Sequence, residues 1–318
     1  MKLLVHSDEP ETFLGVLRQR LPNATVSCCR DYASLPTMLE LERPEILYGI
    51  RFAGTSGFPR QAILEAPSLR WVSVGGSGTD HLAPWDASRL IVTNAAGVAA
   101  ETMAQYAIAA MLSFALGLPA LAAAQRQARW APHRVASVRG RTLAILGLGH
   151  TGRASARLAR ALGMGVIGIR ARPLPTPEVD RLEGPERLHE VLGEADFVLV
   201  CLPLTEMTRG LVDGPALCAM KPGAVLIDVS RGGIVRQAAL IEALRAGRLA
   251  GAALDVFETE PLPPDNPLWA MDNVVISPHC SSVYDGWELR SAEMFCDNAE
   301  RWRKGLRLEN IVDPQRGY

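Results

Sequence analysis

Three short segments of the sequence carry side chains that could act together on a carbonyl substrate. Arg231 precedes two glycines, Glu258 and Glu260 follow an apolar run, and His279 follows another. An arginine binds a carboxylate through two parallel hydrogen bonds, and a histidine exchanges protons near neutral pH. A carboxylate beside the histidine would favour its charged form. The segments predict a site for ketone reduction, although a lone histidine after a strand and exposed glutamates are also common structural features.

A glycine turn supplies the second half of such a reaction. The segment Gly147-Leu148-Gly149-His150-Thr151-Gly152 directly follows the apolar run 142–146 and opens a helical pattern. Glycines permit a tight turn and let the backbone N–H groups of the turn and the helix start approach a pyrophosphate. Because both flanks have the required pattern, the turn predicts a dinucleotide site.

The next strand indicates which dinucleotide binds. In this pattern an acidic residue about 20 positions further on binds the ribose 2′-OH of NAD. The run 165–169 ends instead in Arg170-Ala171-Arg172, with no acidic residue. Two arginines suit the 2′-phosphate of NADP through charge-assisted hydrogen bonds and stacking on adenine. We therefore expect NADP(H) to be preferred, with NAD(H) possible if both arginines are solvated surface residues.

The elements that must position these residues are short apolar runs alternating with helical patterns. This alternation predicts an α/β fold with parallel sheets and helices on both faces. Eleven strands are too many for one small sheet, so we expect two doubly wound parallel-sheet domains. The expected strands are residues 2–6, 25–28, 46–48, 71–74, 91–93, 142–146, 165–169, 197–199, 224–228, 251–255 and 274–276.

Two long helical stretches, residues 99–124 and 284–304, are expected to join the domains. Residues 1–97 with 285–318 would form a discontinuous substrate domain, and residues 98–284 the dinucleotide-binding Rossmann domain. A ligand would bind in the cleft between the two domains. Overlapping the first stretch, residues 102–125 carry no charge and could by length span a bilayer. Because polar residues and a proline interrupt the stretch, we favour a buried interdomain or subunit-interface helix.

Charge, cysteine usage and the N-terminal segment argue against several other classes of protein. The net charge of −1 gives no surplus for nucleic acid or an anionic membrane. The six cysteines are scattered without metal-ligand spacing, so we expect no metal and a reduced, cytoplasmic setting. The N-terminal run reaches Asp8 and Glu9 at once and leaves no room for a signal peptide.

Five motifs in this order resemble the D-isomer-specific 2-hydroxyacid dehydrogenase family. The resemblance spans nearly the whole chain and is strongest from Gly140 to Ser282. The motifs are Arg139-Gly140-Arg141-Thr142-Leu143 before the glycine turn, Leu202-Pro203-Leu204-Thr205 with Thr208, Val229-Ser230-Arg231-Gly232-Gly233, Ala253-Leu254-Asp255-Val256-Phe257 with Glu260-Pro261-Leu262, and Ser277-Pro278-His279.

The resemblance implies roles for individual residues. Arg231 would anchor and polarise the substrate, His279 would transfer the proton, Glu260 would support His279, and Asp255 would lie beside the cofactor. It further implies a two-domain fold, with a flavodoxin-like substrate domain, and a homodimer joined by the charge-free stretch. The positions expected to line the cofactor are Gly147, Gly149, His150, Thr151, Gly152, Arg170, Arg172, Pro203, Thr208, Val229, Arg231, Asp255, His279 and Ser281.

The family binds the substrate carboxylate partly through backbone N–H groups of an N-terminal loop. The matching segment here, Gly75-Gly76-Ser77-Gly78-Thr79-Asp80, is called the substrate loop below. Ser77 and Gly78 are the expected donors, because consecutive small residues after a strand expose backbone N–H groups to an anion. An ordinary glycine loop is the alternative. Candidates for the rest of the pocket are Arg51, Phe52, Tyr284 and Trp287.

Two positions differ from the residues that are usual in this family. Gln105 stands where the family usually has glutamate, near the expected domain junction and away from the chemistry. Arg170 stands where an acidic residue is usual, which resembles the NADP-preferring branch that reduces glyoxylate and hydroxypyruvate to the D-2-hydroxy acid. Two other functions stay open: a dinucleotide-sensing scaffold in transcriptional repression, and an NAD-dependent enzyme like D-3-phosphoglycerate dehydrogenase.

Overall fold

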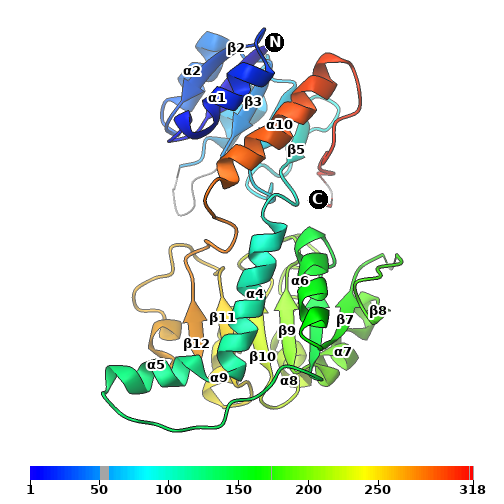
Figure 1. Cartoon of the computed structure of the whole chain (residues 1–318). Coiled ribbons are helices and arrows are strands. Elements are labelled where there is room, and N and C mark those ends of the chain that lie inside the picture. The colour runs from blue at the N-terminus through cyan, green and yellow to red at the C-terminus, as the bar shows by residue number, and fades with distance from the viewer. Residues whose placement is uncertain (51–56, 173, 315, 318) are drawn as a thin grey trace. The chain divides into compact units, whose positions relative to one another are not determined.

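The computed structural model describes residues 1–50, 57–172, 174–314 and 316–317, which fall into two compact units (Figure 1). Met1–Val98 with Tyr284–Tyr318 make up the first unit, and Ala99–Val283 make up the second. Each unit contains one sheet whose strands all pair in parallel. The expected α/β fold with two doubly wound parallel sheets is therefore confirmed.

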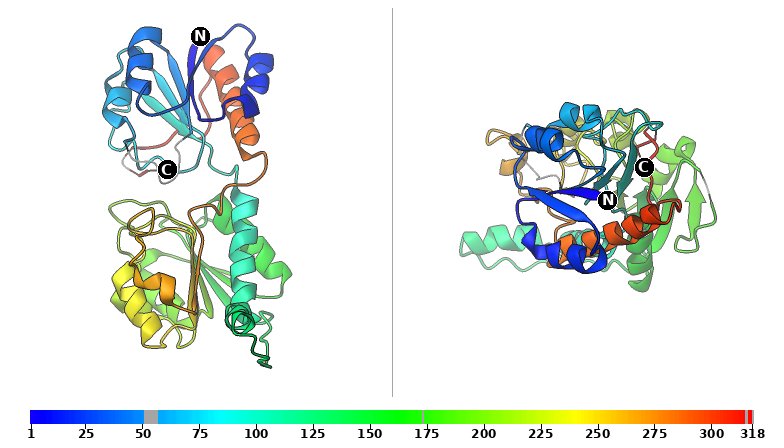
Figure 2. Two further views of the ribbon diagram at one scale, coloured as in Figure 1. Left: turned by 90° about the vertical axis from the view of Figure 1, so that its left-hand side faces the viewer. Right: turned by 90° about the horizontal axis from the view of Figure 1, so that it is seen from above.

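The first unit has the strand order β2-β1-β3-β4-β5, which is that of flavodoxin-like folds. Helices α1 and α10 cover one face of this sheet, and α2 and α3 cover the other (Figure 2). The elements are β1 (Lys2–His6), α1 (Glu11–Arg20), β2 (Thr25–Cys29), α2 (Leu35–Glu42), β3 (Ile46–Gly49), α3 (Arg60–Glu65), β4 (Trp71–Val74), β5 (Ile91–Asn94) and α10 (Trp287–Arg303).

The second unit has the order β12-β11-β10-β9-β6-β7-β8, which extends the Rossmann order by one strand. Its elements are α4 (Ala100–Ala115), α5 (Leu118–Arg126), β6 (Thr142–Leu146), α6 (His150–Ala161), β7 (Gly165–Ile169), β8 (Arg181–Glu183), the 3-10 turn Pro185–Arg187, α7 (Leu188–Glu194), β9 (Phe197–Val200), α8 (Gly214–Ala219), β10 (Val225–Asp228), α9 (Gln237–Arg245), β11 (Gly251–Leu254), the 3-10 turn Pro267–Ala270 and β12 (Val274–Ile276).

The central strands of the second unit are apolar without alternation because both faces are covered. Every residue of β9, β10 and β11 is buried. Helices α4 and α6 pack on one face and α7, α8 and α9 on the other; Figure 2 shows α4 and the yellow α9 on opposite sides of the sheet. Strands buried on both faces have near-continuous hydrophobic runs. Their carboxyl ends form one edge, where the polar segments of interest begin.

The structure corrects the expected elements in two places. It adds β8, whose sequence Arg-Leu-Glu has no apolar run to reveal it. The helix expected over residues 99–124 is two helices, α4 and α5, separated at Gly117. Gly117 has φ +69°, and a Cβ there would lie 2.5 Å from the ring of His133, so the backbone turns where only glycine fits.

The charge-free stretch is accordingly a bent pair. No single helix of the described residues is long and apolar enough to cross a membrane; α4 and α5 meet that test only together, bent by 66°. The side chains of Ala104, Ala107 and Met111 in α4 are buried. Ala107 and Met111 belong to the core that α4 forms with α6 and one face of the sheet, as expected of a buried helix, whereas α5 buries only Ala124.

Candidate active site

The glycine turn joins the end of β6 to the start of α6. Gly147 has φ +102°, a conformation that L side chains rarely adopt, and a Cβ on Gly152 would lie 2.0 Å from the carbonyl oxygen of Gly147. Gly149 precedes the first helical residue, and a Cβ there would meet no atom within 4 Å. Two glycines thus permit the turn, and the third leaves the helix N-terminus open to an anion. These residues fit a pyrophosphate.

The remaining residues expected to line the cofactor lie at neighbouring strand ends. Arg170 directly follows β7 and is half-buried, and Arg172 is exposed. Thr208 holds the loop after β9, because its hydroxyl donates to the carbonyl oxygen of Pro203 at 2.6 Å and accepts the N–H of Thr205 at 2.8 Å. This hydroxyl therefore shapes the loop. Val229 is buried after β10.

Arg231 lies in a tight turn after β10. Its Nη1 donates to the carbonyl oxygen of Ser230 at 2.7 Å. A Cβ on Gly232 would lie 1.7 Å from the carbonyl oxygen of Phe257, so the turn packs directly on the backbone that follows β11. Asp228 accepts hydrogen bonds from the N–H of Ser230, at 3.0 Å, and from its hydroxyl. The Arg231 guanidinium is therefore hydrogen-bonded to the turn that Asp228 holds.

His279 and Glu260 form a hydrogen-bonded pair. The distance between His279 Nδ1 and Glu260 Oε2 is 2.8 Å, and the two side chains are 26% and 27% exposed. Burial alone would raise the pKa of Glu260. The hydrogen bond from His279, the hydrogen bond from the Phe257 N–H at 3.0 Å, and the charges of His279 and Arg231 outweigh burial, so this pKa is lowered. An ionised carboxylate only accepts, so Nδ1 donates and Nε2 is left for a substrate.

The backbone of His279 has φ +53°, in the left-handed region. Such a conformation costs a non-glycine residue about 1–3 kcal/mol and persists only where surroundings impose it. Here the N–H of His279 donates to the carbonyl oxygen of Asp255 at 2.9 Å. The Asp255 carboxylate accepts from the Ser277 hydroxyl at 2.5 Å, from the Cys280 N–H at 2.9 Å, and from both the N–H and the hydroxyl of Ser281. Asp255 thus fastens the segment that carries His279.

The structure separates the two candidate glutamates. Glu258 Oε1 accepts the N–H of Gln237 at 3.0 Å, at the start of α9. Glu260 instead holds His279. Nothing in the spacing of the sequence distinguished them, because both follow the same strand.

The substrate loop lies in the first unit, after β4. Ser77 is exposed and Gly78 is half-buried. Asn94, the last residue of β5, donates through Nδ2 to the carbonyl oxygen of Ser77 at 2.7 Å and accepts the N–H of Ala96 at 3.2 Å. Sequence reasoning missed Asn94; its signal would have been a polar residue at the end of an apolar strand.

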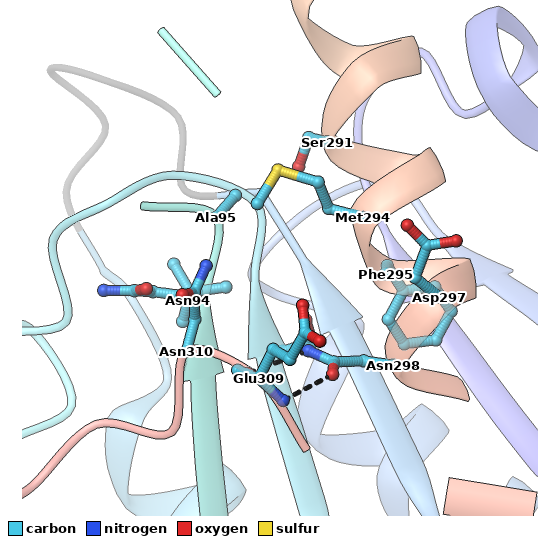
Figure 3. Close-up of a pocket in the computed structure, with 11 residues that line it drawn as sticks. Asn94, Ala95, Ser291, Met294, Phe295, Asp297, Asn298, Glu309 and Asn310 are labelled. Carbon is cyan, nitrogen blue, oxygen red and sulfur yellow. Dashed lines mark hydrogen bonds between the residues drawn. The ribbon is translucent and has the colours of Figure 1, made fainter. Parts of the chain in front are cut away.

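A small cavity lies beside Asn94 (Figure 3). Its volume is about 40 Å³, room for one or a few water molecules. Across it, Asn298 of α10 forms two hydrogen bonds with the backbone of Glu309, at 2.7 and 3.0 Å. The cavity thus lies where hydrogen bonds attach the C-terminal segment to α10, and it is too small for a substrate.

The structure describes two of the four other pocket candidates, Tyr284 and Trp287. Arg51 and Phe52 lie outside the described residues. The hydroxyl of Tyr284 donates to the carbonyl oxygen of Val98 at 2.9 Å. The indole N–H of Trp287 is buried without a hydrogen-bond partner among the described residues. None of the candidates that the structure describes is thereby shown to touch a substrate.

Comparison with known proteins places the fold and site in a family. Residues 108–281 match the profile of the D-isomer specific 2-hydroxyacid dehydrogenase, NAD binding domain. A glyoxylate reductase of Korarchaeum cryptofilum is 36% identical over 260 residues, covering 79% of this chain and 78% of the relative. A D-3-phosphoglycerate dehydrogenase of Methanocaldococcus jannaschii is 31% identical over 259 residues, covering 80% of this chain but 49% of the relative.

A solved structure agrees over the full length. The NADPH-dependent glyoxylate/hydroxypyruvate reductase of Sinorhizobium meliloti, in complex with NADP and sulfate, is 26% identical, with a TM-score of 0.85 over 100% of this chain and 99% of that one. Family profile, relatives and structure agree. The chain therefore belongs to the D-isomer specific 2-hydroxyacid dehydrogenase family and is an oxidoreductase of CH–OH groups.

Proposed function

We propose that this enzyme uses NADPH to reduce a small 2-keto acid of the glyoxylate or hydroxypyruvate type to its D-2-hydroxy acid. The observation that carries the proposal is the 2.8 Å hydrogen bond between Glu260 and His279, beside the turn that directs Arg231. An acid, its supporting carboxylate and a cation for the substrate are the groups that this reduction requires.

The proton route follows from the hydrogen bonds. Because Nδ1 of His279 donates to Glu260, the proton for the substrate oxygen comes from Nε2. Glu260 stabilises the charged imidazole and fixes its ring, and Arg231 binds the substrate carboxylate and stabilises charge on the carbonyl oxygen. Backbone N–H groups of Ser77 and Gly78 supply further donors to the carboxylate. When bound, the nicotinamide supplies the hydride.

The cofactor preference rests on Arg170 and Arg172. Arginine binds a phosphate through parallel charge-assisted hydrogen bonds, and the position after β7 has no carboxylate for a ribose 2′-OH. The Sinorhizobium meliloti reductase, whose structure holds NADP, supports the same assignment.

The test is a set of initial rates with glyoxylate and hydroxypyruvate, each with NADPH and with NADH. We expect higher kcat/KM with NADPH, and a loss of about tenfold or more in that preference when Arg170 and Arg172 are both replaced by alanine, since a hydrogen bond to a charged group contributes about 1.5–3 kcal/mol. Arg187→Ala, which removes an exposed arginine paired with Glu190, is the matched control. A preference for NADH in the unaltered enzyme would refute the cofactor assignment.

The same rates test the alternatives. The Methanocaldococcus jannaschii relative supports a second candidate, NAD-dependent action on a phosphorylated hydroxy acid, although this chain matches only 49% of that relative. Turnover of D-3-phosphoglycerate with NAD, without turnover of glyoxylate, would establish that candidate. Binding of the dinucleotide without turnover of any keto acid would favour a sensing scaffold.

We also propose a homodimer and a cytoplasmic location. Leu118 and Trp130, on and after α5, are 48% and 93% exposed. Apolar side chains this exposed suit a subunit interface. All six cysteines are free thiols, which suits a reducing compartment. Trp130→Ser should lower the dimer's stability in analytical ultracentrifugation, and a monomeric unaltered protein would refute the assembly.

A further inference from the structure

Two buried carboxyl groups lie at neighbouring strand ends beneath the candidate active site. Asp228 ends β10 and is 2% exposed, and Asp255 follows β11 and is 1% exposed. The N–H of Asp255 donates to the carbonyl oxygen of Asp228 at 3.0 Å, so the two residues are backbone neighbours across the sheet. Two like charges that share a buried site disfavour each other.

The hydrogen bonds decide which of the two carries the charge. Asp255 accepts from four donor groups, spread over both its oxygens: the Ser277 hydroxyl, the Cys280 N–H, and the N–H and hydroxyl of Ser281. Asp228 accepts from two donors, both on Ser230 and both at Oδ1. Hydrogen bonds to a carboxylate favour its charged form, so this arrangement favours the negative charge on Asp255 and the proton on Asp228.

The surroundings of Asp228 agree with this assignment. Burial raises its pKa to about 7, the charge of Asp255 acts in the same direction, and the hydrogen bonds from Ser230 and the charge of Arg231 act in the opposite one. Among the described residues, the thiol of Cys201, after β9, also interacts with Asp228, and burial raises the pKa of this thiol to about 12. Cys201 therefore adds no charge near neutral pH.

We propose that Asp228 is a positioning residue for Arg231, and that it serves in this role as a neutral carboxylic acid. Oδ1 of Asp228 holds Ser230, whose carbonyl oxygen accepts a hydrogen bond from the Arg231 guanidinium. Ionised Asp228 would place a negative charge near Arg231 and compete with the substrate carboxylate for the positive charge of the guanidinium. The inference rests on the proposed function, in which Arg231 binds that carboxylate.

The size of the effect follows from linkage. A carboxylate bound to Arg231 adds negative charge near Asp228 and favours its protonated form, so ionisation of Asp228 weakens substrate binding by the same factor. One unit of pKa change on binding corresponds to a tenfold change in affinity. We therefore expect KM for the keto acid to rise by about tenfold between about pH 6 and about pH 9.

The experiment compares the unaltered enzyme with Asp228→Asn. The amide keeps an oxygen acceptor for Ser230 and cannot ionise. We measure kcat and KM for glyoxylate with saturating NADPH across this pH range. In Asp228→Asn the rise in KM should disappear, while the pH dependence of kcat should stay as in the unaltered enzyme. An equal rise in KM in both proteins would overturn the proposal.

Two further variants sharpen the test. Asp196→Asn is the matched control, because Asp196 precedes β9 at the opposite edge of the same sheet, where it accepts the N–H of Thr142 at 2.8 Å. Its KM should follow pH as in the unaltered enzyme. Ser230→Ala removes the hydroxyl that stabilises ionised Asp228, so the rise in KM should move to higher pH. This variant tests the proposal if Asp228→Asn does not fold.

A measurement without turnover separates this inference from the proposed function. With aspartate carboxyl carbons labelled by ¹³C, one resonance should titrate near pH 7 in the unaltered protein and in Asp196→Asn, and be missing from Asp228→Asn. If no keto acid is turned over, the proposed function fails while this titration still decides the state of Asp228. A spectrum in which every aspartate titrates below about pH 5 would overturn the inference.

Discussion

Replacing Glu260 by glutamine should disable proton transfer while leaving the fold and cofactor binding intact. In the structure the two carboxylate oxygens accept from different donors, the Phe257 N–H at 3.0 Å and the His279 Nδ1–H at 2.8 Å. A glutamine has only one oxygen, so either orientation of its amide places an NH₂ group against an N–H donor. The charged imidazole loses its counter-charge in either orientation, and it also loses its acceptor when the NH₂ group faces Nδ1.

The expected loss can be derived from this geometry. A hydrogen bond to a charged group contributes about 1.5–3 kcal/mol, and both side chains are about three-quarters buried, so kcat/KM for keto-acid reduction should fall by about tenfold to 100-fold. NADPH affinity, measured by fluorescence, should not change.

Glu258→Gln is the control for this prediction. Glu258 follows the same strand but caps α9 through Gln237, so the variant should change stability slightly and leave kcat/KM and its pH dependence as they are. If Glu260→Gln kept more than about a third of the unaltered kcat/KM, the Glu260–His279 pair would be a structural feature and the reasoning above would be wrong.

Three further predictions concern the substrate loop, the glycine turn and Asp228. Asn94→Ala removes a tether of the substrate loop and should raise KM for the keto acid by about three- to tenfold at unchanged NADPH affinity, and an unchanged KM would contradict the tether. Gly152→Ala places a Cβ against the Gly147 carbonyl, so it should lower the free energy of urea unfolding by about 1–3 kcal/mol and also weaken NADPH binding. Gly149→Ala, whose Cβ meets no atom, should weaken NADPH binding alone. Equal unfolding midpoints for the two variants would argue against the close contact at Gly152. The pKa of Asp228 is about 7 against an ordinary 3.8, so the folded state holds a proton that the unfolded chain has released, and the stabilising contribution of Asp228 is complete below about pH 4 and lost by about pH 7. Relative to Asp228→Asn, the unaltered protein should therefore lose up to ~1.4 kcal/mol of unfolding free energy per pH unit in that range. If the unfolding free energies of the two proteins changed in parallel with pH, the shift in pKa would be excluded.

The fold could be predicted from the sequence because its strands are buried on both faces. Runs such as Phe-Val-Leu-Val in β9 have no polar position to disguise them. β8 escaped prediction because it is a short edge strand with charged side chains at both ends. The break between α4 and α5 escaped because the contact that makes glycine necessary at position 117 comes from His133, which is distant in the sequence.

The candidate site was partly predictable for a similar reason. Gly147 to Gly152, Arg231 and His279 adjoin strand ends, so local order shows where they lie. Spacing alone could not choose between Glu258 and Glu260, because the choice depends on which one reaches His279 in the folded chain; only the family resemblance indicated Glu260. The state of Asp228 depends on how four donors are distributed around Asp255, which is a property of the folded chain alone.

The left-handed backbone of His279 has a consequence for how this protein can change by mutation. A glycine at position 279 would adopt φ +53° without steric penalty, whereas histidine is held there by its neighbours. Selection for thermal stability alone, with no demand for turnover, would therefore favour exchange of this histidine. Libraries of this protein sorted only for resistance to heat should accumulate inactive clones altered at position 279, so such screens need an activity step.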